Sequence, residues 1–130
     1  MMRTQRKPRF MALPSDHAMH LGYNPDAFLE KSDCIIVLEC DVPWIPSKKA
    51  PLPDAKIIHL AVDPLYSAYP MRSFPSDLGI SGVLSGTLPM LAESLRQRAS
   101  KHRDAIEARR KRLAETRAHQ RARWQDILDK

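Results

Sequence analysis

The sequence predicts an α/β protein with a partial Rossmann-like parallel sheet of about three strands, flanking helices and a long basic C-terminal helix. Two apolar segments, CIIVLEC at 34–40 and KIIHLAV at 56–62, run almost without polar interruption. Such runs are typical of strands in a parallel sheet that are covered on both faces. From Leu84 leucines recur at helical spacing, and beyond residue 95 basic residues dominate.

The predicted elements are arranged in order along the chain. Residues 1–11 are expected to be irregular. The segment 24–33 predicts a short helix, with Asn24 as its N-cap and Pro25 at its first helical position. The two apolar segments predict the first two strands, and LGISGV at 78–83 predicts a weaker third.

The connections between these strands are rich in proline, and parallel neighbours need crossovers instead of tight turns. We therefore expect at most one short helical turn in each connection. Three strands with one packed helix leave sheet edges and an apolar face uncovered, which predicts self-association or a partner chain.

The helical series of Leu84, Leu88, Leu91 and Leu95 predicts an amphipathic helix. Since Pro89 is best tolerated in a first turn, the helix is expected to begin near Thr87 as its cap, with Leu84 before it. Beyond residue 95 the apolar positions thin out, which predicts a mostly solvated helix over 96–130.

Charge divides the chain at the same place. Residues 1–95 carry nine Lys/Arg and ten Asp/Glu, whereas residues 96–130 carry twelve and five, so the net charge of +6 arises in the C-terminal part.

No window approaches the apolar length of a membrane span, and the N-terminus does not resemble a secretory signal. We expect a cytoplasmic protein with no membrane partner, in which Cys34 and Cys40 are small buried apolar residues.

Several side chains are candidates for chemistry. Asp41 and Asp63 close the two apolar segments, and carboxyl ends of parallel strands form the ligand-binding edge of open α/β sheets. They could act as paired carboxylates, but no nucleophile or glycine-rich loop accompanies them, so we expect them to end their strands and cap the next segments of chain. Trp44 and Tyr66, just beyond the strand ends, either line a pocket or pack against a partner.

The histidines favour structural roles. His17 and His20 have a metal-like H-x-x-H spacing, but no carboxylate or Cys pair lies nearby to complete a zinc site. A hydrogen bond that fixes the loop is the favoured interpretation. His59 lies among apolar neighbours in the second strand and is expected to be a hydrogen-bonded core residue.

The order DHAMHLG, DCIIVLECD, PDAKIIHLAVDP and DLGISG resembles the central domain of thiamine-diphosphate-dependent enzymes of the acetolactate synthase type. Asp16, His17 and Gly22 match the family's first loop, and Asp33 opens the first strand. Other matches are Pro53, Asp54 and Ala55 before the second strand, and Asp63 and Pro64 after it. The resemblance covers residues 12 to about 95, and the basic segment 96–130 resembles the linker to the next domain.

The resemblance implies a parent enzyme that cleaves or joins 2-oxo acids with thiamine diphosphate and Mg²⁺. In that family the central domain does not bind thiamine diphosphate, although some members hold FAD or ADP there. Glu39 and Asp41 stand where the family has Gly and Arg, which disfavours a bound pyrophosphate. If this domain holds a cofactor, Asp63 is the residue we expect at the site.

Neither the family's catalytic glutamate domain nor its Gly-Asp-Gly and Asn motif is present in the sequence. We therefore expect a fragment or split subunit that is structural and not catalytic alone, and that joins the missing domains or a second copy of itself. The alternative is a small basic adaptor that binds nucleic acid through Arg109–Arg112 and its neighbours. A hydrated linker helix accounts for the same composition, because the basic residues surround the helix and acidic residues interrupt them.

Overall fold

The computed structural model describes residues 14, 16–71 and 74–129, and the predicted irregular segment 1–11 lies outside them. The chain forms two compact units. One consists of residues 24–93, and the other joins the residues before 24 to those after 93. The first unit contains the sheet.

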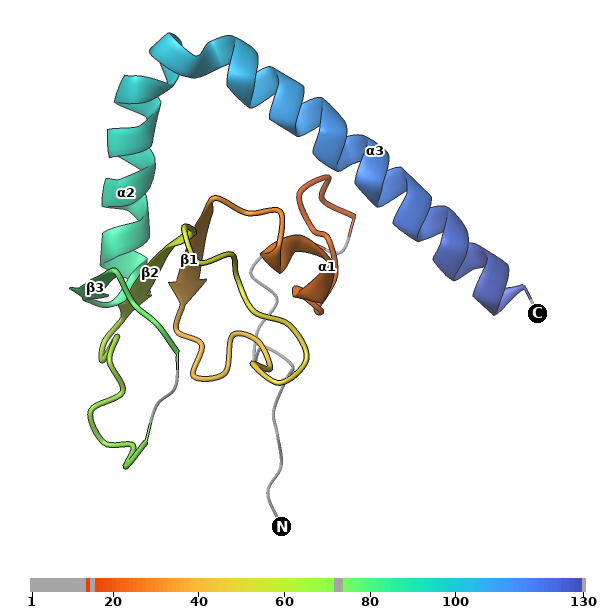
Figure 1. Ribbon diagram of the computed structural model, residues 1–130. Helices are drawn as coiled ribbons and strands as arrows, with labels where there is room; N and C mark the ends of the chain where they lie inside the picture. Colours follow the sequence, from red (N-terminus) through yellow and green to blue (C-terminus); the bar gives the residue numbers. More distant parts are fainter. Residues whose placement is uncertain (1–13, 15, 72–73, 130) are drawn as a thin grey trace. The chain divides into compact units, whose positions relative to one another are not determined.

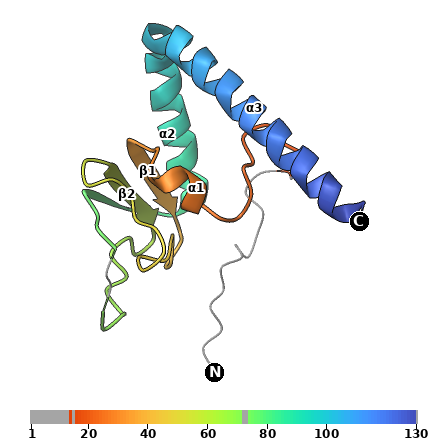
Figure 2. The same ribbon diagram turned by 45° about the vertical axis from the view of Figure 1, so that its right-hand side comes forward.

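Three parallel strands form the sheet, in the order β1-β2-β3. They are β1 (Cys34–Leu38), β2 (Lys56–Ala61) and β3 (Leu78–Ser81), and Figures 1 and 2 show β1 and β2 side by side. In the register of the sheet, Val37 lies opposite His59, and His59 lies opposite Gly79. The prediction of co-directional neighbouring strands from the two apolar segments is confirmed. The topology shows a three-stranded parallel sheet and does not by itself identify the fold as Rossmann-like.

One side of the sheet packs a small apolar core. Leu29, Val37, Trp44 and Ile57 are each 5% exposed or less and form one cluster. Ile35, Cys40 and Phe74 pack against its edge. Alternate residues of a strand point to opposite faces, so the odd-numbered positions of β1 and β2 supply this core.

The prediction that the strands are covered on both faces is wrong at the margins of the sheet. On the face opposite the core, Leu60 at the centre is 2% exposed, but Ile36 is 45%, Leu38 is 38% and Leu78 is 50% exposed. We call Ile36, Leu38 and Leu78 the apolar margins. The physical reason is position, because β1 and β3 are the outer strands of this sheet and only β2 has neighbours on both sides.

Cys34 lies on the same face and is exposed, and Cys40 is half-buried, so the prediction of two buried cysteines is also wrong. The predicted uncovered apolar surface of the sheet is confirmed by the exposed fractions of Ile36, Leu38 and Leu78.

The first helix, α1 (Asp26–Leu29), is one turn long and shorter than expected. The predicted N-cap at Asn24 is wrong by one residue, because Pro25 is the N-cap and has no side-chain capping bond. Asn24 instead accepts a hydrogen bond from the Asp26 N–H through its side-chain oxygen at 3.1 Å. Pro25 precedes the helix and does not open it. The helix ends at Leu29. Just beyond it, the Ser32 hydroxyl donates a hydrogen bond to the carbonyl oxygen of Phe28 at 2.8 Å.

Helix α2 (Leu84–Ala99) begins earlier than expected, and Leu84 is its first residue. The N–H groups of Gly86 and Thr87 both donate to the Val83 carbonyl oxygen at 3.0 Å, so the first turn forms before Pro89. The Thr87 hydroxyl donates to the same carbonyl at 3.1 Å instead of capping an N–H. Pro89 therefore lies inside the helix, where its missing N–H leaves out one hydrogen bond of the ladder.

The basic helix predicted over 96–130 is divided. A short 3₁₀ segment, η1 (Ser100–His102), separates α2 from α3 (Arg103–Leu128), and His102 has φ −126° and ψ 21°, outside helical values. Figure 1 shows the bend at this point. The sequence has no glycine or proline at this bend. Residues 100–102 are all exposed, so packing does not keep α2 and α3 in one continuous helix.

Candidate functional site

Asp63 comes after β2 at the carboxyl edge of the sheet, where the sequence predicts ligand binding. Its Oδ2 accepts hydrogen bonds from the backbone N–H of Ser67 at 2.7 Å and from the Ser67 hydroxyl at 2.9 Å. Asp63 therefore ends its strand and caps the next turn, as expected. Both hydrogen bonds come from Ser67, so this residue fixes the orientation of the Asp63 carboxylate.

Asp41 comes after β1 at the same edge. Its Oδ1 accepts the backbone N–H of Val42 at 3.0 Å, and its Oδ2 accepts the hydroxyl of Tyr69 at 3.4 Å. The Tyr69 ring stacks on Tyr66, with ring centroids 5.5 Å apart and planes 4° from parallel. Because Tyr66 belongs to the turn that Asp63 caps, Tyr69 connects the two strand ends.

Two residues at this edge have left-handed backbone conformations. Glu39 has φ 41° and Tyr66 has φ 51°, in the region where a side chain costs about 1 kcal/mol or more relative to glycine. The Glu39 N–H donates to the Leu60 carbonyl oxygen at 3.0 Å, so this conformation comes directly after the last pairing of β1 with β2. An acidic side chain therefore occupies a position whose backbone favours glycine.

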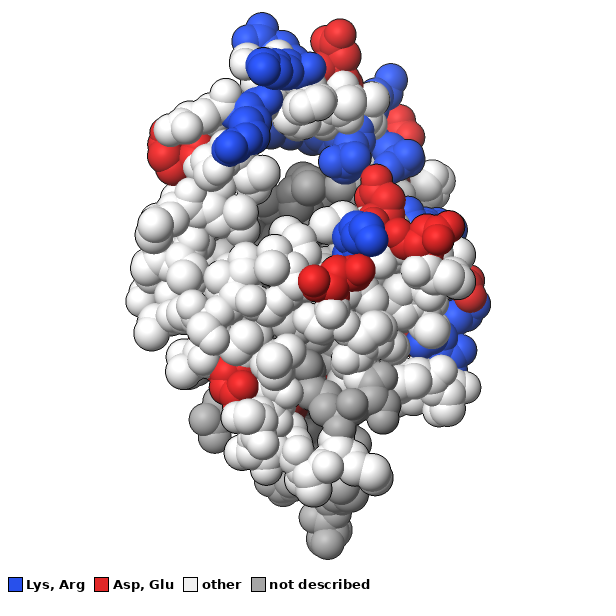
Figure 3. All heavy atoms as spheres, turned by 60° about the vertical axis from the view of Figure 1, so that its left-hand side comes forward, with Lys and Arg blue, Asp and Glu red and all other residues white. Residues whose placement is uncertain are grey.

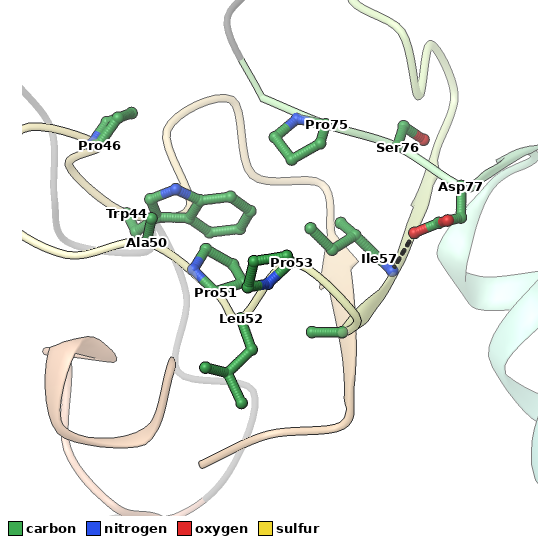
Figure 4. Close-up of a pocket in the computed structure, with 11 residues that line it drawn as sticks. Trp44, Pro46, Ala50, Pro51, Leu52, Pro53, Ile57, Pro75, Ser76 and Asp77 are labelled. Atoms are coloured by element: carbon green, nitrogen blue, oxygen red, sulfur yellow. Dashed lines mark hydrogen bonds between the residues drawn. The ribbon is translucent and has the colours of Figure 1, made fainter. Parts of the chain in front are cut away.

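The hollow of the sheet unit lies at the opposite, amino-terminal edge. It encloses about 390 Å³ and is lined mainly by apolar side chains of the two connections, together with Ile57 at the start of β2. Figure 4 shows the Trp44 indole between Pro75 on one side and Pro51 and Pro53 on the other. Trp44 is 4% exposed and packs edge-on against Phe74, so it belongs to both the core and the hollow.

The carboxylate of Asp77 lies at the rim of this hollow, immediately before β3. Its Oδ2 accepts the backbone N–H of Ile57 at 2.8 Å, and its Oδ1 accepts Lys56 Nζ at 3.4 Å. The hydrogen bond from Ile57 lowers the pKa of Asp77 below its ordinary value; desolvation opposes the shift, and Lys56 adds to it. These contacts tie the beginnings of β2 and β3 together.

The sequence named Trp44 as a residue that could line a pocket, and Trp44 does line this hollow, whereas Tyr66 is not among its lining residues. The position of the hollow at the amino-terminal edge was missed, because the sequence analysis looked for polar groups at the carboxyl edge. The available signal was the set of prolines around Trp44 and before Asp77, which places rigid apolar groups on both connections. Among the described residues, the lining includes the hydroxyl of Ser76 and no histidine, cysteine or lysine that could activate it. The chemistry of the hollow is that of an apolar surface with one charge-paired carboxylate at the rim.

His59 is 1% exposed in the middle of β2, and its Nε2 lies 3.2 Å from the Pro75 carbonyl oxygen. An imidazole N–H donating to this carbonyl satisfies both groups. The prediction of a hydrogen-bonded core histidine is confirmed. This contact also holds Pro75 at the wall of the hollow.

In the other unit, the loop with the two histidines packs on α3. His17 Nδ1 accepts the backbone N–H of Met19 at 3.1 Å, which confirms its predicted loop-fixing role. Arg117 is 5% exposed, and its guanidinium donates to the His20 carbonyl oxygen at 2.6 Å. Trp124 lies against Gly22, which has φ 95°. A basic residue predicted to be solvated is thus a buried anchor of the loop.

Two polar atoms near this anchor, His20 Nδ1 and Gln120 Oε1, are buried without a hydrogen-bond partner among the described residues. Within the same described ranges, no group of three or more His, Cys, Asp or Glu side chains could hold a metal ion. None of the helices described is both long enough and apolar enough to cross a membrane.

Comparison of the chain with protein-family models, with curated proteins and with solved structures found no match.

Proposed function

We propose that the chain is a structural part of a thiamine-diphosphate-dependent enzyme of the acetolactate synthase type, corresponding to its central domain. In this proposal it completes a larger enzyme and has no turnover alone. The parent chemistry is cleavage or ligation of 2-oxo acids with thiamine diphosphate and Mg²⁺, both bound by the missing domains. The proposal rests first on the order of sequence segments that resembles this family.

The observation that carries the proposal is an incomplete sheet. Among the described strands, β1 pairs with β2 only, and the apolar margins Ile36, Leu38 and Leu78 are 38–50% exposed. Edges and apolar surface of this kind are normally covered in a stable protein. Further strands and helices of the same domain, supplied by another chain, would cover them.

The backbone at Glu39 adds support. The family has glycine near the end of the first strand, and Glu39 has the positive φ that favours glycine. The backbone at this position is therefore compatible with the glycine of the family, although the side chain departs from it. At the same edge, a carboxylate in place of glycine repels a pyrophosphate, so FAD or ADP is not part of the proposal.

The proposed lack of catalytic activity is supported by how the carboxyl edge is used. Asp41 and Asp63 are engaged by Tyr69 and Ser67, so they support the two turns. General acid or base catalysis needs a group in reach of a substrate proton, and both carboxylates instead hold the chain.

Reconstitution tests this proposal. Isothermal titration of the chain alone with thiamine diphosphate and Mg²⁺ should give no binding, and pyruvate should not be consumed. Mixing the chain with polypeptides that carry the two thiamine-binding domains, encoded by neighbouring reading frames, should restore consumption of a 2-oxo acid. Tight binding of the cofactor by the isolated chain would overturn the assignment.

A matched pair of variants locates the interface. Ile36→Lys with Leu38→Lys places two charges on the apolar margins and should abolish reconstitution. Val62→Lys with Leu65→Lys is the control, because Val62 and Leu65 are 64% and 61% exposed after β2 and lie outside the margins. Equal loss in both variants would contradict docking through β1.

A further inference from the structure

The densest charge of the molecule lies in a short part of the C-terminal region. Residues 96–112, which we call the basic segment, contain eight Lys/Arg and two Asp/Glu, whereas residues 113–130 contain four and three. Nearly the whole excess of positive charge is therefore in the basic segment. Every residue from 101 to 112 is exposed, so these charges are available to a partner.

The bend between α2 and α3 brings three arginines together. Arg96 of α2 and Arg103 and Arg110 of α3 line one hollow of about 370 Å³. Figure 3 shows Lys and Arg side chains gathered over this bend. Glu107 is 3.7 Å from Arg110 in an exposed pair, which is too weak to neutralise the group. Like charges that converge in this way favour a polyanionic ligand.

The side-chain chemistry indicates phosphate. Six of the eight cations are arginine, namely Arg96, Arg98, Arg103, Arg109, Arg110 and Arg112. The planar guanidinium forms two parallel hydrogen bonds to a phosphate, which a lysine cannot do. An anionic membrane is a poorer fit, because surface-bound helices need an apolar face and Ile106 is the single large apolar residue of the segment.

We propose that the basic segment binds the phosphate backbone of duplex DNA by lying in the major groove, a property separate from the proposed enzyme role. The major groove of B-DNA admits an α-helix and has phosphates on both walls, so cations on all sides of the helix can find partners. The deep, narrow groove of duplex RNA does not admit one. Residues 103–112 extend about 15 Å, enough to cross the groove.

The part of α3 beyond residue 112 packs against a loop, whereas residues 103–112 are exposed. Beyond residue 112 the helix is occupied by the loop that Arg117 and Trp124 hold. The loop contacts the part of α3 beyond residue 112, which explains why the cations at 101–112 are exposed while Arg117 is buried. One helix thus has an anchored part and a free basic part.

Fluorescence anisotropy with a labelled 20-base-pair DNA of arbitrary sequence tests the proposal on the full chain. Binding should weaken with salt, with a slope of log K against log salt of about −5 if some six phosphates are neutralised. Duplex RNA and single-stranded RNA of the same length should bind at least tenfold more weakly, and vesicles with anionic lipid should not compete.

The matched variants are Arg103→Gln with Arg110→Gln, and the control Arg121→Gln with Arg123→Gln, which removes the same charge from the exposed end of the same helix. The first pair should reduce affinity by on the order of 50-fold at 0.1 M salt and flatten the slope by about 2. The control should change affinity less than threefold. Circular dichroism should show unchanged helix content in both.

Several results would overturn the proposal: no binding at 50 mM salt, equal losses in the two variant pairs, or tighter binding to either RNA or to vesicles than to duplex DNA. These results leave the enzyme proposal untouched, because reconstitution depends on the apolar margins of β1.

Discussion

Gly82, between β3 and α2, offers the sharpest test of packing in the sheet unit. A Cβ at this position would lie 2.5 Å from Cγ2 of Thr87 and 3.8 Å from its Cβ. The Gly82 N–H also donates to the Ala61 carbonyl oxygen at 2.9 Å, so the backbone is tied to β2 and cannot easily withdraw. We predict that Gly82→Ala destabilises the fold through this one methyl group.

The magnitude is the balance of two opposing terms. The contact is about 1 Å short of the optimal carbon–carbon distance, and overpacking of this kind costs about 1–3 kcal/mol. Replacing glycine by alanine also restricts the unfolded chain, which stabilises by about 0.4–1 kcal/mol. Rotation of Thr87 away from the clash would disturb its hydroxyl bond to Val83. The expected net destabilisation is about 0.5–2 kcal/mol.

Urea unfolding followed by circular dichroism measures this in a double-mutant cycle with Thr87→Ser. Serine removes Cγ2 and keeps the hydroxyl, so in that background Gly82→Ala should be neutral or stabilising. The coupling free energy should be about 1–3 kcal/mol. Gly86→Ala is the control, since nothing lies within 4 Å of its Cβ position and a helical glycine is replaced; it should stabilise by about 0.5–1 kcal/mol.

Coupling below about 0.5 kcal/mol would refute the reasoning, because the cost of Gly82→Ala would then not come from Thr87. Destabilisation by Gly86→Ala would show that α2 does not begin at Leu84.

The remaining predictions concern the two tryptophans, the loop anchor and acid stability. Trp44→Ala should cost about 3–5 kcal/mol in urea unfolding because the indole is buried, whereas Trp124→Ala, at 46% exposure, should cost less than half as much. Arg117→Ala removes a charged hydrogen-bond donor worth about 1.5–3 kcal/mol and should speed amide exchange in the loop that it holds, as read by hydrogen–deuterium exchange. The pKa of Asp77 is lowered in the folded state, chiefly by the Ile57 N–H, so its contribution to stability is present above the unfolded pKa of about 3.9 and is lost as pH falls through the lower folded pKa. Urea midpoints between pH 2 and 5 should therefore fall more steeply in the wild type than in Asp77→Asn.

Each of these has an opposite outcome that would count against the structure. Equal effects of the two tryptophan changes would place Trp44 outside the core. Unchanged exchange in the loop would mean that Arg117 does not anchor it. Parallel pH profiles for wild type and Asp77→Asn would show that the carboxylate does not tie β2 to β3.

Local pattern predicted the first two strands well because each is a nearly continuous apolar run bounded by polar residues. The ends of β1 and β2 fall within two residues of the apolar segments, and the parallel pairing agrees with connections too long and too proline-rich for hairpins. The same pattern predicted that Asp41 and Asp63 lie at the carboxyl edge of the sheet, because each follows an apolar run. Asp63 ends β2 and caps the next turn as a strand-end aspartate should.

The errors share a different cause, since they concern burial and packing partners. Apolar character gave no indication that Ile36 is exposed while Val37 beside it is buried, because that depends on which groups pack on each face of the sheet. The helix break before Arg103 has no local signal, and the early start of α2 arises because the Val83 carbonyl accepts two N–H groups ahead of Pro89.

The sequence by itself determined the three strands, the parallel pairing of β1 with β2, the capping role of Asp63 and the concentration of positive charge after residue 95, since these depend on residue types and their spacing. Only the tertiary structure decided which cations are buried, where the proline-lined hollow lies and which apolar side chains remain open. Those properties depend on groups brought together from distant positions in the chain, such as Arg117 with the His20 carbonyl.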